Sequence, residues 1–174
     1  MQVHGIHYPA LIVKNMDESL EFYRKLGLQV LYTEPNRDDP ESLQTLLHAG
    51  RESFLMLVGP VDPNLKLAEA SPGVGSMQYL TLNVTAELMD NMFHDLASSG
   101  VQASEEIRRG YERLVFMEDP NGVLITLLAW AVEPPEGMSR AAVLARAAKL
   151  RDEVGAPFIE EPQLRRAIEE LTAG

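Results

Sequence analysis

Cysteine is absent from this 174-residue sequence, and basic residues are scarce. Without cysteine the chain can form no disulfide, thiolate nucleophile or cysteine-ligated metal site. Lys and Arg number 15 against 26 Asp and Glu, which gives a net charge of −11. A surface this acidic repels phosphate backbones and anionic lipid, so we expect neither nucleic acid nor membrane as a partner.

Long apolar runs are also missing. No stretch approaches the roughly 18 residues of a membrane span, and the amino terminus lacks a basic region followed by a long apolar core. No glycine-rich loop carries the lysine of a phosphate site, and no serine, histidine and carboxylate set is visible. The apolar fraction of 45% is nevertheless enough for a core. We therefore expect a globular protein of the cytoplasm.

The sequence contains an internal duplication. A shift of 71 residues places Tyr8 on Tyr79 and Phe22 on Phe93, and a shift of 70 places 54–58 (FLMLV) on 124–128 (LITLL). The offset barely changes over the repeat, and the period exceeds that of common solenoid repeats. We therefore expect two similar halves of one domain, about 6–60 and 77–130, joined by a proline- and glycine-bearing linker at 61–76.

Each half has the same predicted order of elements. In the first, residues 7–13 alternate as a strand does, with Leu11 and Val13 on one face and Tyr8, Ala10 and Ile12 on the other. Asn15 can cap the helix that follows, which Gly27 ends. Further strands are predicted at 28–33, 43–48, 54–58, 114–117 and 123–130, with an exposed loop at 34–41.

The second half repeats this order more clearly. Leu80, Leu82 and Val84 form an apolar strand face, whereas Tyr79, Thr81 and Asn83 form a more polar one. Met89, Met92, Phe93, Leu96 and Ala97 follow with helical spacing. One strand face should therefore pack on a helix, while the other faces a more hydrated environment.

Residues 133–174 lie beyond the duplication and are predicted to be helical. Ser139 can cap a first amphipathic helix, and a second can begin at Pro162. Such an extension can pack on the outside of the sheet, on a partner subunit, or over the pocket as a lid.

The order and spacing of two segments resemble the vicinal oxygen chelate superfamily. These are 15–30 (NMDESLEFYRKLGLQV) and 116–128 (FMEDPNGVLITLL). The superfamily includes glyoxalase I, extradiol dioxygenases and bleomycin-binding proteins, and the resemblance covers about residues 6–130. It implies an α+β fold of two tandem β-α-β-β-β modules forming a cup-shaped sheet in residues 1–132, with 133–174 as a helical extension. It also implies homodimers.

In enzymes of that superfamily, His, Gln and Glu side chains bind a divalent metal in the cup. By the resemblance, the ligand positions fall on Tyr8, Met56, Tyr79 and Thr126. Divalent ions require imidazole or carboxylate ligands, and a tyrosine with a pKa of about 10 is a poor one at neutral pH. We therefore expect no metal and no other cofactor. A bulge that shifted the register in both halves would instead bring His7 and Gln78 into the cup.

Several residues are candidates for ligand binding, and each has an alternative role. Tyr8 and Tyr79 either form an aromatic floor for a planar ligand or pack against each other. Trp130 either lines the mouth of the cup or covers the sheet beneath the extension. Arg108, Arg109 and Tyr111 either clamp an anion or are solvated. The full ligand-binding set is Tyr8, Met56, Tyr79, Thr126, Asn83, Tyr111 and Trp130.

The preferred function is a metal-free binding protein of the bleomycin-resistance type that holds a small apolar or aromatic molecule. The alternative is a lyase, isomerase or dioxygenase of the glyoxalase type. It would use shifted metal ligands, or a metal-free mechanism with His48 or the tyrosines as catalytic groups. His48 ends a predicted strand and is otherwise a surface histidine. A third hypothesis is a filled cup whose extension binds a protein partner.

Overall fold

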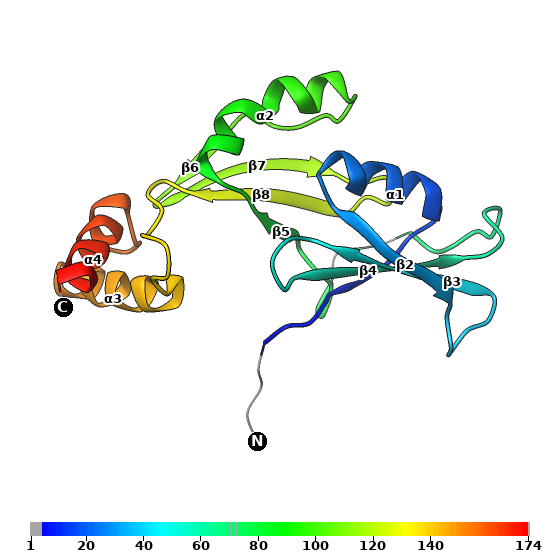
Figure 1. The fold of residues 1–174 in the computed structure, drawn as a ribbon, viewed down its shortest axis with the longest axis horizontal. Helices are drawn as coiled ribbons and strands as arrows, with labels where there is room; N and C mark the ends of the chain where they lie inside the picture. Colours follow the sequence, from blue (N-terminus) through cyan, green and yellow to red (C-terminus); the bar gives the residue numbers. More distant parts are fainter. Residues whose placement is uncertain (1–4, 70, 72, 174) are drawn as a thin grey trace. The chain divides into compact units, whose positions relative to one another are not determined.

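The computed structural model describes residues 5–69, 71 and 73–173. Positions 70 and 72 of the predicted linker lie outside the described residues. The described chain has two four-stranded sheets and four helices (Figure 1). The first module contains β1 (Ala10–Ile12), α1 (Met16–Lys25), β2 (Gln29–Pro35), β3 (Ser42–His48) and β4 (Phe54–Pro60). The second contains β5 (Leu80–Asn83), α2 (Ala86–Ser98), β6 (Ile107–Arg109), β7 (Glu112–Glu118) and β8 (Leu124–Trp130).

The two modules have the same topology. The strand orders are β1-β4-β3-β2 and β5-β8-β7-β6, so the first strand of each module lies beside the last. The Val13 N–H donates to the Val58 carbonyl at 2.8 Å, and the Val84 N–H donates to the Leu128 carbonyl at 2.8 Å. These two bonds are related by the offsets of the sequence repeat. The predicted α+β fold of two β-α-β-β-β modules is confirmed.

Strand β1 is shorter than the predicted strand at 7–13. Regular pairing begins only at Ala10, which lies beside Met56 of the parallel strand β4. Pro9 has no N–H to donate, and its carbonyl accepts the Met56 N–H at 3.0 Å. The predicted alternation does hold within the strand, because Leu11 and Val13 are buried while Ile12 is exposed.

Other strand boundaries also extend beyond the prediction. β2 continues to Pro35, into the predicted loop, and β6 was not predicted at all. These segments are polar, but cross-strand pairs accommodate polar side chains on an exposed sheet face. Glu34 pairs in register with Gln44, whose amide donates to the Glu34 carboxylate at 2.6 Å.

Helix α1 is capped as predicted and is attached to a distant turn. The Asn15 side-chain oxygen accepts the backbone N–H groups of Asp17 and Glu18 at 3.0 and 3.2 Å. On its buried face, the Tyr23 hydroxyl donates to Asp119 at 3.0 Å. The turn at 119–122 therefore fixes the helix of the first module as well as joining two strands.

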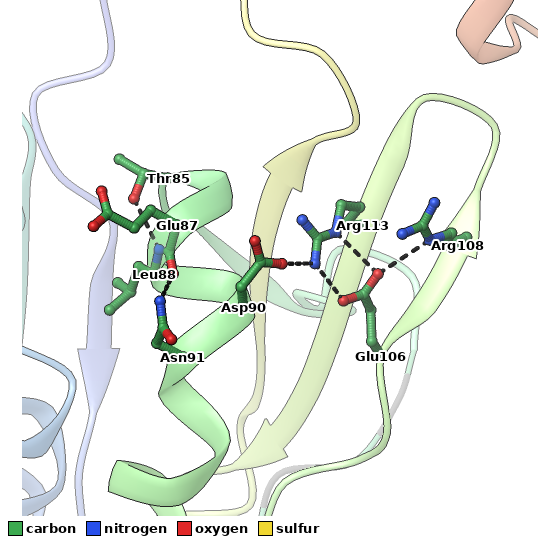
Figure 2. Close-up of polar contacts among 8 residues, drawn as sticks. All are labelled: Thr85, Glu87, Leu88, Asp90, Asn91, Glu106, Arg108 and Arg113. Atoms are coloured by element: carbon green, nitrogen blue, oxygen red, sulfur yellow. Dashed lines mark hydrogen bonds and ion pairs between the residues drawn. The ribbon is translucent and has the colours of Figure 1, made fainter.

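Helix α2 is bound to β7 through a charged network (Figure 2). Arg113 donates to Asp90 of α2 at 2.6 Å and to Glu106 at 2.6 Å. Met89, Met92 and Leu96 are buried as their spacing predicts, whereas Phe93 is 38% exposed. Because Arg113 points to α2, this helix covers the Arg113 face of β7.

The extension forms two helices that lie side by side, α3 (Arg140–Glu153) and α4 (Glu161–Ala173) (Figure 1). The Ser139 hydroxyl caps α3 by accepting the Ala142 N–H at 3.3 Å. The helices share a core with the last strand, which we call the extension core: Trp130, Val143, Ala147, Leu150, Leu164 and Ala167. Among the described residues, no helix has the length and apolar character needed to cross a bilayer.

Candidate functional site

The first sheet has one face beneath α1 and one face free of it. Leu11 and Leu57 are register partners on the buried side, which α1 contacts through β4. Ala10 and Met56 are partners on the opposite side, and Met56 in turn lies beside Leu46. We call this opposite side the open face. Met56, a predicted ligand-binding residue, is buried at its centre.

Four rings gather at one end of the open face. The His7 ring lies 5.2 Å from that of Tyr8 and 5.0 Å from that of Phe54, and Phe54 lies 5.9 Å from His48. Phe54 is two residues before Met56 on β4, so the two side chains share a face. We call these four residues the aromatic cluster.

His7 reaches the open face by a route that the sequence pattern did not reveal. If side chains alternated through 7–13, the His7 ring would lie on the α1 face of the sheet, opposite to Tyr8. Since regular pairing begins at Ala10, the backbone of residues 7–9 is free of that alternation. The ring of His7 therefore packs on Phe54 without any bulge in β1.

His48 has a defined tautomer when it is neutral. Its Nε2 lies 2.7 Å from the Arg51 carbonyl oxygen, which can only accept, so Nε2 carries the hydrogen. The lone pair of the neutral ring is then on Nδ1. The side chain is partly exposed at the end of β3, so Nδ1 is the atom able to take up a proton.

The second sheet also has two distinct faces. The Ala131 N–H donates to the Tyr111 carbonyl at 2.8 Å, which places Arg113 near Ala129 and on the face of α2. Trp130 points to the other face, where it is buried in the extension core. Thr126 lies four residues before Trp130 on the same strand, and therefore on the same face. The extension thus packs on the face that carries Thr126, not on the helix side of this sheet.

Three of the predicted ligand-binding residues interact at the base of the extension. Arg140 donates to the Asn83 side chain at 2.5 Å and to Glu133 at 2.6 Å, and its guanidinium stacks 5.0 Å from the Trp130 ring centre. The Tyr111 and Trp130 rings meet edge to face at 5.4 Å. Sequence reasoning missed Arg140, because nothing in the pattern indicated which face the extension covers.

Thr126 and Tyr79 have contrasting environments. Thr126 is 1% exposed, and its hydroxyl has no hydrogen-bond partner among the described residues. Tyr79 directly precedes β5 and is 40% exposed. The hydroxyl of Thr126 is therefore enclosed by the protein, whereas the ring of Tyr79 is accessible to solvent.

At the four positions that the superfamily resemblance implies for metal ligands, Tyr8, Met56, Tyr79 and Thr126, the side chains are poor ligands for a divalent metal. Met56 offers a buried thioether and Thr126 an alcohol, and the two tyrosines would have to lose protons to bind. Within residues 5–69, 71 and 73–173, no three His, Asp or Glu side chains are grouped so that they could hold a metal ion. His7 packs on a ring, and Nε2 of His48 is taken by a carbonyl.

Comparisons with known proteins identify the family. Residues 5–127 match the model of the Glyoxalase/Bleomycin resistance protein/Dioxygenase superfamily. The chain belongs to this superfamily. No curated protein sequence matches the chain.

Solved structures from the superfamily share the fold. A glyoxalase family protein from Enterococcus faecalis has 20% identity and a TM-score of 0.58, covering 72% of this chain and 97% of its own. Glyoxalase I of Leishmania major has 20% identity and a TM-score of 0.56, covering 88% and 99%. The fosfomycin resistance protein FosX of Listeria monocytogenes, complexed with Mn(II), has 16% identity and a TM-score of 0.56, covering 76% and 95%. At these identities the likeness establishes the fold alone.

Proposed function

We propose that this superfamily member binds a small apolar or aromatic molecule without a metal. The observation that supports this proposal is the aromatic cluster on the open face of the first sheet. It includes Tyr8, one of the positions at which the superfamily resemblance implies a metal ligand. It borders Met56, which is another.

The chemistry of the open face suits a planar ligand. Aromatic rings offer stacking surfaces, and the Tyr8 hydroxyl adds one directional hydrogen bond. Met56 supplies a polarisable, adaptable surface beneath them. Tyr32 of β2 lies on the same face, because it is the register partner of Leu46. Tyr8 and Tyr32 are 42% and 43% exposed, so apolar ring area remains for a ligand to cover.

The other predicted residues complete the proposal. Tyr79 is the counterpart of Tyr8 in the repeat, and the Thr126 hydroxyl has no hydrogen-bond partner in the described part of the chain. The remaining members of the ligand-binding set are Asn83, Tyr111 and Trp130. Contacts at the base of the extension fix their side chains. We further infer a homodimer, as the superfamily resemblance suggests, and a location in the cytoplasm, which suits a chain without cysteine.

The proposal is tested by finding a ligand and then removing the tyrosines. Elemental analysis of the purified protein, with and without added Mn, Fe, Ni, Zn and Mg, comes first; a stoichiometric metal would overturn the metal-free assignment. Small aromatic compounds are then screened by ligand-observed NMR. Tyr8→Ala and Tyr79→Ala should each weaken the best ligand by about tenfold, the equivalent of one lost stacking contact.

Phe93→Ala is the matched control, because Phe93 is an aromatic residue 38% exposed on α2. Its removal should leave affinity unchanged. If both tyrosine variants bind as the parent does, the proposal is wrong.

An enzyme of the glyoxalase type is a second candidate, which the free Nδ1 of His48 favours. A neutral imidazole with a defined tautomer can act as a general base. Turnover that survives a strong chelator and is lost in His48→Gln would support a metal-free reaction. If the chelator abolished the activity and one added metal restored it, the result would instead favour shifted metal ligands such as His7.

A further inference from the structure

A cavity lies where the β6–β7 hairpin meets the connection between α3 and α4. Its volume is about 420 Å³. The hairpin contributes 109–112, and the extension contributes Arg151 and 157–160. The extension half of this cavity lies beyond the segment that matches the superfamily, so the cavity combines a hairpin of the superfamily domain with an added element.

The hairpin directs two adjacent arginines, Arg108 and Arg109, to opposite faces of the second sheet. In the β6–β7 register Arg108 lies beside Arg113, and Arg109 lies beside Glu112. Arg108 therefore shares the α2 side with Arg113 and contacts Glu106 at 3.3 Å, whereas Arg109 points to the opposite face and lines the cavity. Among the described residues, Arg109 has no hydrogen-bond or ion-pair partner. Its five donors are available to a ligand.

The walls of the cavity are held together by backbone contact. Gly110 has φ of +60°, and a Cβ at this position would collide with the Ile159 carbonyl oxygen. Only glycine allows the hairpin to approach the α3–α4 connection so closely. Ile159 also packs on the extension core, so the connection is anchored on both sides.

The cavity has an aromatic floor and an aromatic rim. Tyr111 lies partly buried with its ring edge to face with that of Trp130. Phe158 is 69% exposed at the rim. An exposed phenylalanine beside a fixed tyrosine offers apolar area that a flat molecule can cover.

Two arginines line the cavity, and they differ in how far they are already paired. Arg151 directs Nε and Nη2 to Asp152, at 3.1 and 2.6 Å, and retains Nη1. Burial, and secondarily Glu112, raises the pKa of Tyr111, so its hydroxyl stays protonated. Glu112 and Glu160 are the acidic residues that line the cavity. The uncommitted guanidinium of Arg109 is the strongest site for an oppositely charged group.

We propose that this cavity is a second binding site that takes a small aromatic carboxylate. The ring lies between Tyr111 and Phe158, and the carboxylate accepts hydrogen bonds from Arg109. The site goes beyond the proposed function and does not depend on it, because no residue of the aromatic cluster lines this cavity; of the proposed ligand-binding set it contains Tyr111 alone.

The test uses the full chain and three probes of one shape and different charge: benzoate, benzamide and benzylamine. Affinities are measured by saturation-transfer NMR over the millimolar range. Benzoate should bind more tightly than the other two. Arg109→Gln should weaken benzoate by about tenfold and leave benzamide unchanged, because it removes one charge-assisted contact. Phe158→Ala should weaken both.

Arg108→Gln is the matched control, since Arg108 is the adjacent arginine on the other face. It should bind benzoate as the parent does. The substituted arginines are on the surface, so the fold is retained in both variants. The proposal is overturned if benzoate does not bind, if benzylamine binds better, or if the two arginine variants weaken benzoate equally. Tyr8→Ala separates this site from the aromatic cluster, because it changes binding only at the latter.

Discussion

Asp119 illustrates how much a single residue of this chain does. Its carboxylate is 4% exposed and accepts four hydrogen bonds. The donors are the Tyr23 hydroxyl (3.0 Å), the Asn121 backbone and side chain (2.8 and 3.0 Å), and the Val123 backbone (2.8 Å). Burial, followed by the charge of Asp119, raises the pKa of Tyr23, so this hydroxyl remains a donor across the neutral range.

Asp119→Ala should therefore destabilise the fold far more than Tyr23→Phe does. The alanine leaves the buried Tyr23 hydroxyl and the backbone N–H groups of Asn121 and Val123 without their acceptor, and should cost about 3 kcal/mol or more of unfolding free energy. The phenylalanine removes one donor while the carboxylate keeps three, and should cost about 1 kcal/mol. Urea unfolding followed by circular dichroism measures both. Equal losses would mean that the backbone bonds to Asp119 contribute nothing.

For individual residues, the sequence predicts the turn at 119–122 but not its attachment to helix α1. Asp, Asn and Gly at 119–122 indicate a turn because each residue type suits one. The bond from Tyr23 spans 96 residues, and no local pattern encodes it. The position of His7 was hidden for a related reason: alternation holds only where a strand is paired, and β1 begins at Ala10.

Among the elements, the network between α2 and β7 should respond to acid. The hydrogen bond from Arg113, aided by the charges of Arg113 and Arg108, holds the pKa of Glu106 below its ordinary value of 4.5, although burial opposes this. A carboxyl whose pKa is lower in the folded state stabilises the fold above its unfolded pKa. That contribution is lost as the pH falls through the folded pKa.

Glu106→Gln should accordingly lower the unfolding free energy by about 1–2 kcal/mol at neutral pH. The gap between variant and parent should narrow below the ordinary carboxyl range, where Glu106 becomes protonated in both states of the parent. Urea midpoints at neutral and acidic pH measure this gap. Glu105→Gln, at the exposed neighbouring residue, should produce no such trend. A gap independent of pH would show that the charge of Glu106 does not stabilise the network.

The elements themselves were largely predictable from local signals. The caps at Asn15 and Ser139 were identified because a short polar side chain preceded an amphipathic run. β6 was missed because Ile107–Arg109 is three residues long and mostly charged. Its strand character comes from pairing with β7, which is a tertiary interaction.

For the whole molecule, the sequence predicted the duplicated fold but not the face that the extension covers. The repeat is visible because equivalent positions in both modules meet the same packing demands. The extension, however, has an apolar stripe that would fit several surfaces equally well. Only the contacts of Trp130 assign it to the Thr126 face of the second sheet. Predicted pocket residues such as Asn83 and Trp130 are consequently held by the extension.

Because the chain has a single tryptophan, its fluorescence reports directly on how the extension is attached. Trp130 is 5% exposed in the extension core, beside Leu164 of α4, which is fully buried. Leu164→Ala should remove packing worth about 2–5 kcal/mol and admit water near the indole. The emission of Trp130 should then shift to longer wavelength at lower urea concentration than in the parent.

Leu171→Ala supplies the comparison within the same helix, since Leu171 is 39% exposed and lies outside the extension core. It should change the emission midpoint little, because a half-exposed leucine leaves no cavity when it is shortened. If the two leucine variants shift the emission alike, Leu164 does not anchor the extension on Trp130. The extension would then be attached to the second sheet through contacts other than the one between Leu164 and Trp130.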